Sequence, residues 1–361
     1  MTEELELAQK RVKTQEEIRV IYKTFAPSLI LRFFSRIFYK NLKQDNPVYW
    51  GMLILSFNFV MLIPSTLYMI ALNDLDFIKN YWMSWVIAVQ VGILALLVSR
   101  YIMKMELIDV ANRLVPKIIN IEDLANLENW LRSSWSINRM GGYVGIIWIT
   151  WVSITVSISS SLQGKFIGYG AAFVTIPTGF LIAISLYYLI WFFFFSIYLG
   201  NLRYELNAIS PAASEVTAIL HTLFTRHLYL SSAFLAIVTY IDFQLKLDAV
   251  GIPFLILSWI AVTTQFMASR STVNKIVDGV KWKTLNKIQK QINQIEETED
   301  LAEKNNNEKL FRLVDTYEKI RITSTNKLDT KAVLTFFSQM MLPLLGLLLG
   351  NLEKLAELFS S

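Results

Sequence analysis

Residues 332–350 read AVLTFFSQMMLPLLGLLLG and contain no aspartate, glutamate, lysine or arginine. A helix needs about 20 predominantly apolar residues to cross the hydrocarbon core of a bilayer, so this stretch predicts a membrane-spanning helix. Six further stretches have the same character, at residues 48–72, 81–99, 142–161, 170–199, 227–241 and 251–268. The segment at 227–241 is short, and we leave open an earlier start within the apolar stretch 216–224.

The basic residues are distributed unevenly between the loops and tails that flank these seven segments. Thirty of the 34 lysines and arginines lie in residues 1–47, 100–141, 200–226 and 269–331. The other four are Lys79, Lys165, Lys246 and Lys354. Cytoplasmic loops of membrane proteins carry an excess of lysine and arginine. We therefore expect a multi-pass protein of the plasma or inner membrane, with its N-terminus inside and its C-terminus outside.

The composition of the chain also favours a membrane protein. Of the 361 residues, 54% are hydrophobic and 17% are charged, whereas soluble domains average about 45–50% and about 25%. We expect an all-α fold in which a bundle of seven transmembrane helices joins a cytoplasmic helical bundle. The expected regions are a cytoplasmic N-terminal region (1–47), six spans with cytoplasmic extensions at 100–141 and 200–226 (48–268), a cytoplasmic helical hairpin (269–331) and the seventh span with a short outer tail (332–361).

Residues 24–40 predict an amphipathic helix with a basic face. Arg32, Arg36 and Lys40 recur every four residues, and aromatic and aliphatic residues line another side. Such a helix can lie on an anionic cytoplasmic leaflet. The alternative is a helix that packs on the other cytoplasmic segments.

Residues 270–325 predict a helical hairpin. Two apolar stripes with steps of three and four residues flank the polar stretch EETEDLAEKNNNEK at 296–309. The stripes are formed by Leu285, Ile288, Ile292 and Ile295, and by Leu310, Leu313, Tyr317 and Ile320. We expect the two helices to pack on each other and on segments 101–140 and 203–226.

Small or weakly polar residues recur along the seventh predicted span. Thr335, Gln339, Pro343, Gly346 and Gly350 are spaced so that they lie near one helical face. Gly346 and Gly350 form a G-x-x-x-G motif, which lets helix backbones approach closely. Two interpretations stay open: the stripe lines a pore on an oligomer axis, or it packs on another helix of the same subunit.

The third predicted span carries a second stripe, made of hydroxyl side chains. Ser153, Ser157 and Ser161 recur every four residues. Small hydroxyl residues at this spacing are typical of helix–helix contacts in membranes. The alternative is a polar ligand pocket that faces the outer leaflet.

The sequence offers little for catalysis. It has no cysteine and only two histidines, His221 and His227, which are six residues apart and point in different directions on one helix. It contains no phosphate-binding loop, dinucleotide fingerprint, zinc-protease motif or nucleophile elbow. We therefore expect no enzyme, cofactor, metal site or nucleic-acid partner. The six clearer spans also lack Asp, Glu and His, which argues against a proton relay.

The layout as a whole resembles the insect odorant and gustatory receptor superfamily. The shared features are seven spans, an inside N-terminus, short outer loops, a cytoplasmic helical bundle and a last span fed by a cytoplasmic helix. In the last span, Thr335 followed by the aromatic Phe336 matches the start of the gustatory pattern T-Y-x5-Q-F, whereas Gln339 comes at a different spacing. The resemblance implies a tetrameric ligand-gated cation channel. In such a channel the last span lines the pore, the cytoplasmic bundle joins the subunits, and ligand binds in the outer half of the transmembrane bundle.

We therefore expect a homo-oligomeric, stimulus- or ligand-gated ion channel in a lipid bilayer, with a small-molecule ligand as its stimulus. One alternative is a membrane-anchored scaffold or sensor that recruits cytoplasmic partners. A second alternative is a small-molecule transporter. The exposure of Gln339 separates channel from scaffold, because the scaffold predicts that this side chain is buried.

Overall fold

The computed structural model describes residues 2–24, 63, 66–67, 70, 86, 90, 93–94, 98, 101–134, 136–162, 183, 186–188, 190–244, 248–298, 304–322 and 330–350. Over these residues the protein is all-α, as the sequence predicts. The one β-type contact within them is an isolated bridge between Ile118 and Tyr204. The predicted basic face of Arg32, Arg36 and Lys40 lies outside the described residues.

Seven α-helices have defined bounds. They are α1 (Thr2–Thr24), α5 (Ile121–Ser134), α6 (Ile137–Leu162), α8 (Glu215–Gln244), α9 (Asp248–Thr298), α10 (Lys304–Ile322) and α11 (Thr330–Gly350). Residues 101–109 and 190–199 are also helical. A π-helical turn, η1 (Val110–Leu114), and a 3-10 turn, η2 (Val115–Lys117), follow residue 109, and a second 3-10 turn, η3 (Pro211–Ala213), precedes α8.

The described helices do not meet the requirements of a membrane span. None of them is both long enough and apolar enough to cross a bilayer. The predicted segments 48–72 and 81–99 lie largely outside the described residues. The seven-span topology therefore stays a prediction.

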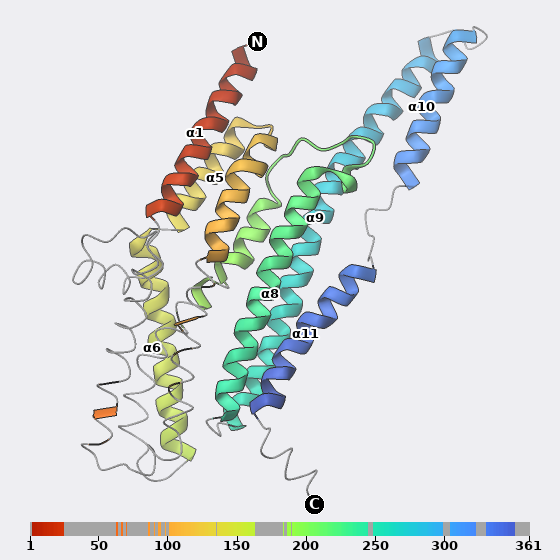
Figure 1. Ribbon diagram of the computed structural model, residues 1–361. Coiled ribbons are helices and arrows are strands. Elements are labelled where there is room, and N and C mark those ends of the chain that lie inside the picture. Colours follow the sequence, from red (N-terminus) through yellow and green to blue (C-terminus); the bar gives the residue numbers. More distant parts are fainter. Residues whose placement is uncertain are drawn as a thin grey trace, which may run out of the picture.

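Helices α8, α9 and α11 lie side by side in Figure 1. Helix α11 runs parallel to α8, because Tyr229 contacts Ser338 and, further along both helices, Ala236 contacts Gly346. Helix α9 runs antiparallel to α11, since the hydroxyl of Thr263 donates to the sulfur of Met340 and, further along α9, Phe266 contacts Phe336, which comes earlier on α11. Helix α8 begins at Glu215, so the short fifth apolar segment is part of a longer helix that includes residues 216–224.

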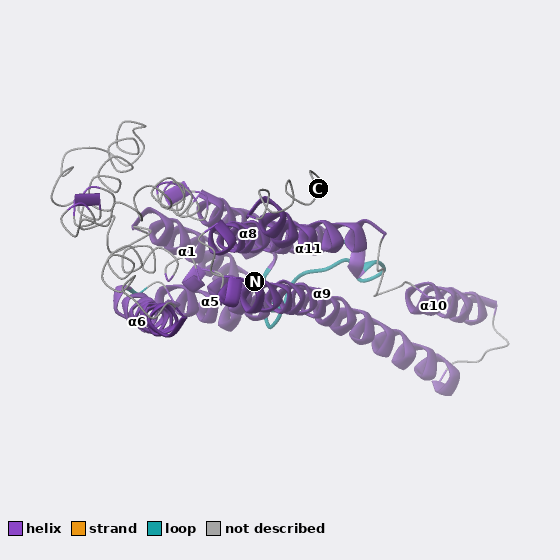
Figure 2. Ribbon diagram, turned by 90° about the horizontal axis from the view of Figure 1, so that it is seen from below, coloured by secondary structure: helices purple, strands orange, loops and turns teal. Residues whose placement is uncertain are grey.

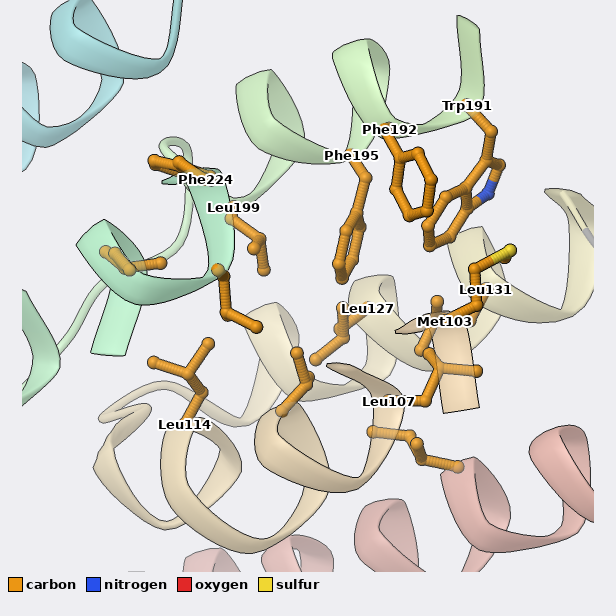
Figure 3. Close-up of a cluster of buried hydrophobic side chains, with 14 of the residues drawn as sticks. Met103, Leu107, Leu114, Leu127, Leu131, Trp191, Phe192, Phe195, Leu199 and Phe224 are labelled. Carbon is orange, nitrogen blue, oxygen red and sulfur yellow. The ribbon is translucent and has the colours of Figure 1, made fainter. Parts of the chain in front are cut away.

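The largest hydrophobic core lies where residues 101–118, α5, residues 190–204, α8 and the middle of α9 meet. Figure 3 shows Leu107, Leu127 and Phe195 pointing toward one another within it. The indole of Trp130 adds an aromatic stack, with its centroid 4.9 Å from Tyr198 and 5.4 Å from Phe195. This core fixes α5 and the helix at 190–199 against the start of α8.

Helix α9 is continuous for 51 residues, so it joins the sixth predicted span to the first helix of the predicted hairpin. Its middle belongs to the large core through Val273 and Val277. Further on, Leu285, Ile288 and Ile292 form a separate cluster with Ile320 of α10. Figure 2 shows that α10 and the end of α9 project away from the other labelled helices. The prediction that the whole hairpin packs on segments 101–140 and 203–226 is therefore wrong for its outer part.

Candidate functional site

The stripe on α11 lies mainly in the contact with α8. Gln339 is fully buried, and Pro343 and Gly346 are buried with it. The side-chain surroundings of Thr335 and Gly350 lie outside the described part of the structure. In this conformation the described part of the stripe faces a helix of the same chain.

Gly346 makes the closest approach of α11 to α8. A Cβ atom at this position would lie 2.1 Å from the carbonyl oxygen of Ala236, and 3.0 Å from its carbonyl carbon. Both atoms belong to the backbone of α8, so no side-chain rotation can relieve such a contact. Only glycine allows the two helices to lie this close, which is the role that the G-x-x-x-G spacing predicts for it.

Gln339 is buried in this contact without a hydrogen-bond partner. Neither its Oε1 nor its Nε2 atom meets a donor or an acceptor. A buried amide in this situation costs about 1–3 kcal/mol. On α9, Gln265 is also buried and its Nε2 atom lacks a partner. Both helices that pack beside α8 therefore carry a buried amide without a complete set of hydrogen bonds.

The opposite face of α11 is apolar and exposed. Its side chains recur every three or four residues, and each is between 45% and 64% exposed. They are Leu334, Phe337, Met341, Leu345 and Leu348. A contiguous row of large apolar side chains on a helix surface is typical of a face that contacts lipid or another protein.

A buried contact between a carboxyl group and an imidazole ring joins the helix at 101–109 to α8. The carboxylate of Glu106 contacts Nε2 of His227, and both side chains are at most 1% exposed. The ring of Phe192 stacks on His227 with a centroid distance of 4.2 Å. The other polar atoms of the pair, Oε1 of Glu106 and Nδ1 of His227, have no hydrogen-bond partner. The pair thus sits in an apolar setting with one polar contact.

The electrostatics of Glu106 follow from this setting. Burial raises the pKa of its carboxyl group, and this effect outweighs the opposing influence of His227 and Arg226. Asp109, one turn further along, raises the pKa as well. The carboxylate form of Glu106 is therefore stabilised less than it would be in water.

An ion pair lies beside the contact between Glu106 and His227 and is partly exposed. Nη1 of Arg226 lies 2.7 Å from Oδ2 of Asp109.

His221, one and a half turns before His227, is half-buried. Burial lowers the pKa of its imidazole, and the nearby charge of Arg270 on α9 lowers it as well. The two histidines are therefore separate in space and in environment, as their spacing predicts.

The serine stripe of the third predicted span lies on α6. Ser153 is exposed. The surroundings of Ser157 and Ser161 lie outside the described residues.

Sequence reasoning missed the pair of Glu106 and His227. It treated His227 only as one of two histidines that point in different directions, and it gave Glu106 no role. A signal was present, because Glu106 is three residues after Met103 and four before Val110, both of which are buried. A charge on the apolar face of an amphipathic helix needs a partner, and a distant histidine was a candidate.

For this chain, neither a metal-binding group among the described residues nor a related protein is found. In the described part of the chain, no group of three or more His, Asp or Glu side chains is placed to hold a metal ion. Comparisons with family models, curated proteins and solved structures found no match.

Proposed function

We propose that the chain is a multi-pass membrane protein and forms a homo-oligomeric, stimulus-gated ion channel. In this proposal α11 is the gating element, and its exposed apolar face lines a hydrophobic constriction that closes by excluding water. The observation that carries the proposal is the division of α11 into a face packed closely on α8 and an opposite face that is apolar and exposed.

The apolar surface of the other helices supports placement in a bilayer. Large aliphatic side chains are exposed on α6 and on the first half of α9, including Ile146, Ile149, Ile256, Leu257 and Ile260. The same half of α9 contains no charged residue between Asp248 and Arg270. Lipid tails cover such surfaces without the cost that water imposes.

The chain is suited to a test by single cysteines, because it contains none of its own. Met341→Cys and Gln339→Cys form a matched pair on α11, since Met341 is half exposed and Gln339 is buried. The full chain is reconstituted in a planar bilayer, and current is recorded before and after a charged thiol reagent. We expect unitary currents, a change on treatment of Met341→Cys, and no change for Gln339→Cys or the parent.

Two outcomes contradict this proposal. If no currents appear and Met341→Cys stays unlabelled, the exposed face of α11 contacts lipid and lines no pore. If only Gln339→Cys responds, the pore lies on the face that packs on α8, and α11 must turn when the channel opens. A response at both positions places α11 in a wet path without defining its pore face.

The burial of Gln339 also favours the second candidate, a membrane-anchored scaffold. This candidate uses the projecting hairpin, on which Trp282 of α9 and Phe311 of α10 are more than half exposed. It predicts that Phe311→Ser abolishes co-purification of a cytoplasmic partner while currents are absent from every variant.

A further inference from the structure

Two pairs of polar side chains join the helix at 101–109 to α8. The pair of Glu106 and His227 is buried, whereas Asp109 and Arg226 are 20% and 40% exposed. The two contacts therefore hold the same elements together in different solvent environments. The exposed pair provides an internal control for the buried one.

In the described part of the structure, groups from three elements face the buried pair of Glu106 and His227. The helix at 101–109 contributes the carboxylate of Asp109, and α8 contributes the guanidinium of Arg226; both act electrostatically on Glu106. The helix at 190–199 contributes the uncharged ring of Phe192. The two flanking charges are opposite in sign and bind each other. The net charge of the junction is therefore decided by the protons on Glu106 and His227.

We propose that Glu106 and His227 form a proton-binding site, which holds one proton while the junction is closed and releases it when water enters. With one proton the pair is neutral overall, either as carboxylate and imidazolium or as carboxylic acid and imidazole. Loss or gain of a proton leaves a net charge in a site that solvent does not reach, which is costly. The closed junction therefore retains the proton over a wide range of pH.

The open junction behaves differently, because water solvates both side chains. Solvated glutamate and histidine side chains titrate near about pH 4.3 and about pH 6.5. Above about pH 6.5 the open pair carries no proton, so the closed state binds one proton more than the open state. The opening equilibrium constant then rises about tenfold per pH unit, since one proton is released on opening. Between about pH 4.3 and 6.5 both states hold one proton, and opening is independent of pH.

The sign agrees with the raised pKa of Glu106. A group whose pKa is raised in the closed state stabilises that state at low pH, and the stabilisation disappears as pH rises. The consequence reaches α11, because α8 also carries the contact between Ala236 and Gly346. An alkaline shift in the compartment that faces this junction therefore loosens the helix on which α11 is packed.

The experiment measures how well a cysteine near the pair is protected from a neutral thiol reagent. Ser231 is one turn after His227 on α8 and is buried, whereas Thr222 on the same helix is exposed. Ser231→Cys reports opening, and Thr222→Cys supplies the reference rate, so that the ratio of the two rates removes the titration of the thiol itself. The purified full-length chain is measured from pH 5 to pH 9. We expect protection to be constant below about pH 6.5 and to fall about tenfold per pH unit above it.

Substitutions of the pair change this profile in opposite directions. With Glu106→Gln, the closed pair is neutral without a bound proton, and only the open state binds one, on the solvated His227. Protection is therefore constant above about pH 6.5 and decreases as the pH is lowered further. His227→Gln leaves the protonated carboxyl group of Glu106 alone, so the fall extends down toward about pH 5. Asp109→Asn breaks the exposed pair and is expected to keep the pH slope of the parent.

The proposal is overturned if the parent and a folded pair variant give the same profile. It is also overturned if Asp109→Asn alone removes the slope, because the exposed pair would then be responsible. Two pair variants with opposite expected shifts keep the test decisive if one of them does not fold. The measurement requires no current, so its failure leaves the proposed channel untouched, and the failure of the channel leaves this site untouched.

Discussion

Helices α1 and α11 are both docked on the body of the protein, but by different kinds of contact. Helix α11 lies against α8 through a glycine at van der Waals range and through apolar side chains. Helix α1 is rich in charged residues; Ile18 anchors it in the large core, and its polar side chains add hydrogen bonds and ion pairs. The contact of α11 depends on the close fit of apolar and backbone atoms, whereas the contact of α1 also depends on hydrogen-bond donors and acceptors. They should therefore respond to different perturbations.

The polar contact of α1 depends on an irregular turn. The change from α-helix to π-helix and then to 3-10 helix at residues 110–117 leaves backbone carbonyl groups without a regular partner. Arg11 donates from Nε and Nη2 to the carbonyl oxygen of Ile118, at 3.0 and 2.8 Å. Gln15 donates to the carbonyl oxygen of Ala111 at 2.9 Å. The side chains of α1 thus complete the hydrogen bonding of the turn.

The largest effect is expected at Gly346. Gly346→Ala places a methyl group against the backbone of Ala236, and overpacking of this kind costs about 1–3 kcal/mol or more. Thermal unfolding of the purified chain measures the loss. The control is Gly279→Ala on α9, where nothing lies within 4 Å of the new Cβ atom; it should stabilise the protein by up to about 1 kcal/mol. Equal effects at both glycines would show that α11 is not closely packed on α8.

The next effect is expected at Arg11. Arg11→Ala removes two charge-assisted hydrogen bonds to one carbonyl group and is expected to cost about 1.5–3 kcal/mol. Hydrogen exchange should accelerate in α1 and in residues 110–118 and remain unchanged in α11. Lys13→Ala removes the same charge from an exposed position of α1 and serves as control. Acceleration in α11 would mean that the two docked helices are coupled.

A smaller effect, of opposite sign, is expected at Gln339. Gln339→Met replaces an unpartnered amide by a flexible apolar side chain of similar length. We expect stability to increase by about 1 kcal/mol, because the desolvation cost of the amide disappears. The change is measured by thermal unfolding beside the parent chain. A loss of stability would indicate that water or a ligand satisfies the amide.

The smallest effect is expected from salt. Lys10 pairs with Glu128 at 3.2 Å, and Arg132 pairs with Glu17 at 2.9 Å. Partly exposed ion pairs contribute at most about 1 kcal/mol and are screened by salt. Hydrogen exchange in α1 should therefore increase slightly in high salt, whereas exchange in α11 should not. A larger change in α11 would contradict the distinction between the two contacts.

Local patterns predicted the all-α character of the described residues and two of their helix contacts. The charge-free stretch at 332–350 lies within α11. The two apolar stripes of the predicted hairpin, between residues 285 and 320, pack together in one hydrophobic cluster. Gly346 of α11 contacts α8, and packing on a helix of the same subunit is one of the two interpretations that the spacing of the small residues allows. These features follow from periodicity along a single helix, and periodicity is readable without a structure.

Contacts between distant segments were harder to predict. Glu106 and His227 are far apart in the sequence, and nothing local to either residue identifies the other. The irregular turn at 110–117 was also missed, although Pro116 interrupts the helical pattern there. The continuity of α9 was missed for another reason. The change from apolar to charged residues near Arg270 reflects a change of surroundings along the helix and does not mark the end of the helix.

The continuity of α9 has a mechanical consequence. At a rise of 1.5 Å per residue, a helix of 51 residues is about 75 Å long. Its middle is fixed in the large core through Val273 and Val277, so this region acts as a fulcrum between the arm beside α11 and the arm that carries α10. A tilt of about 5° about the fulcrum moves each tip by about 3 Å in opposite directions. A tilt of α9 as one rigid helix would therefore displace the arm beside α11 and the arm that carries α10 in opposite directions.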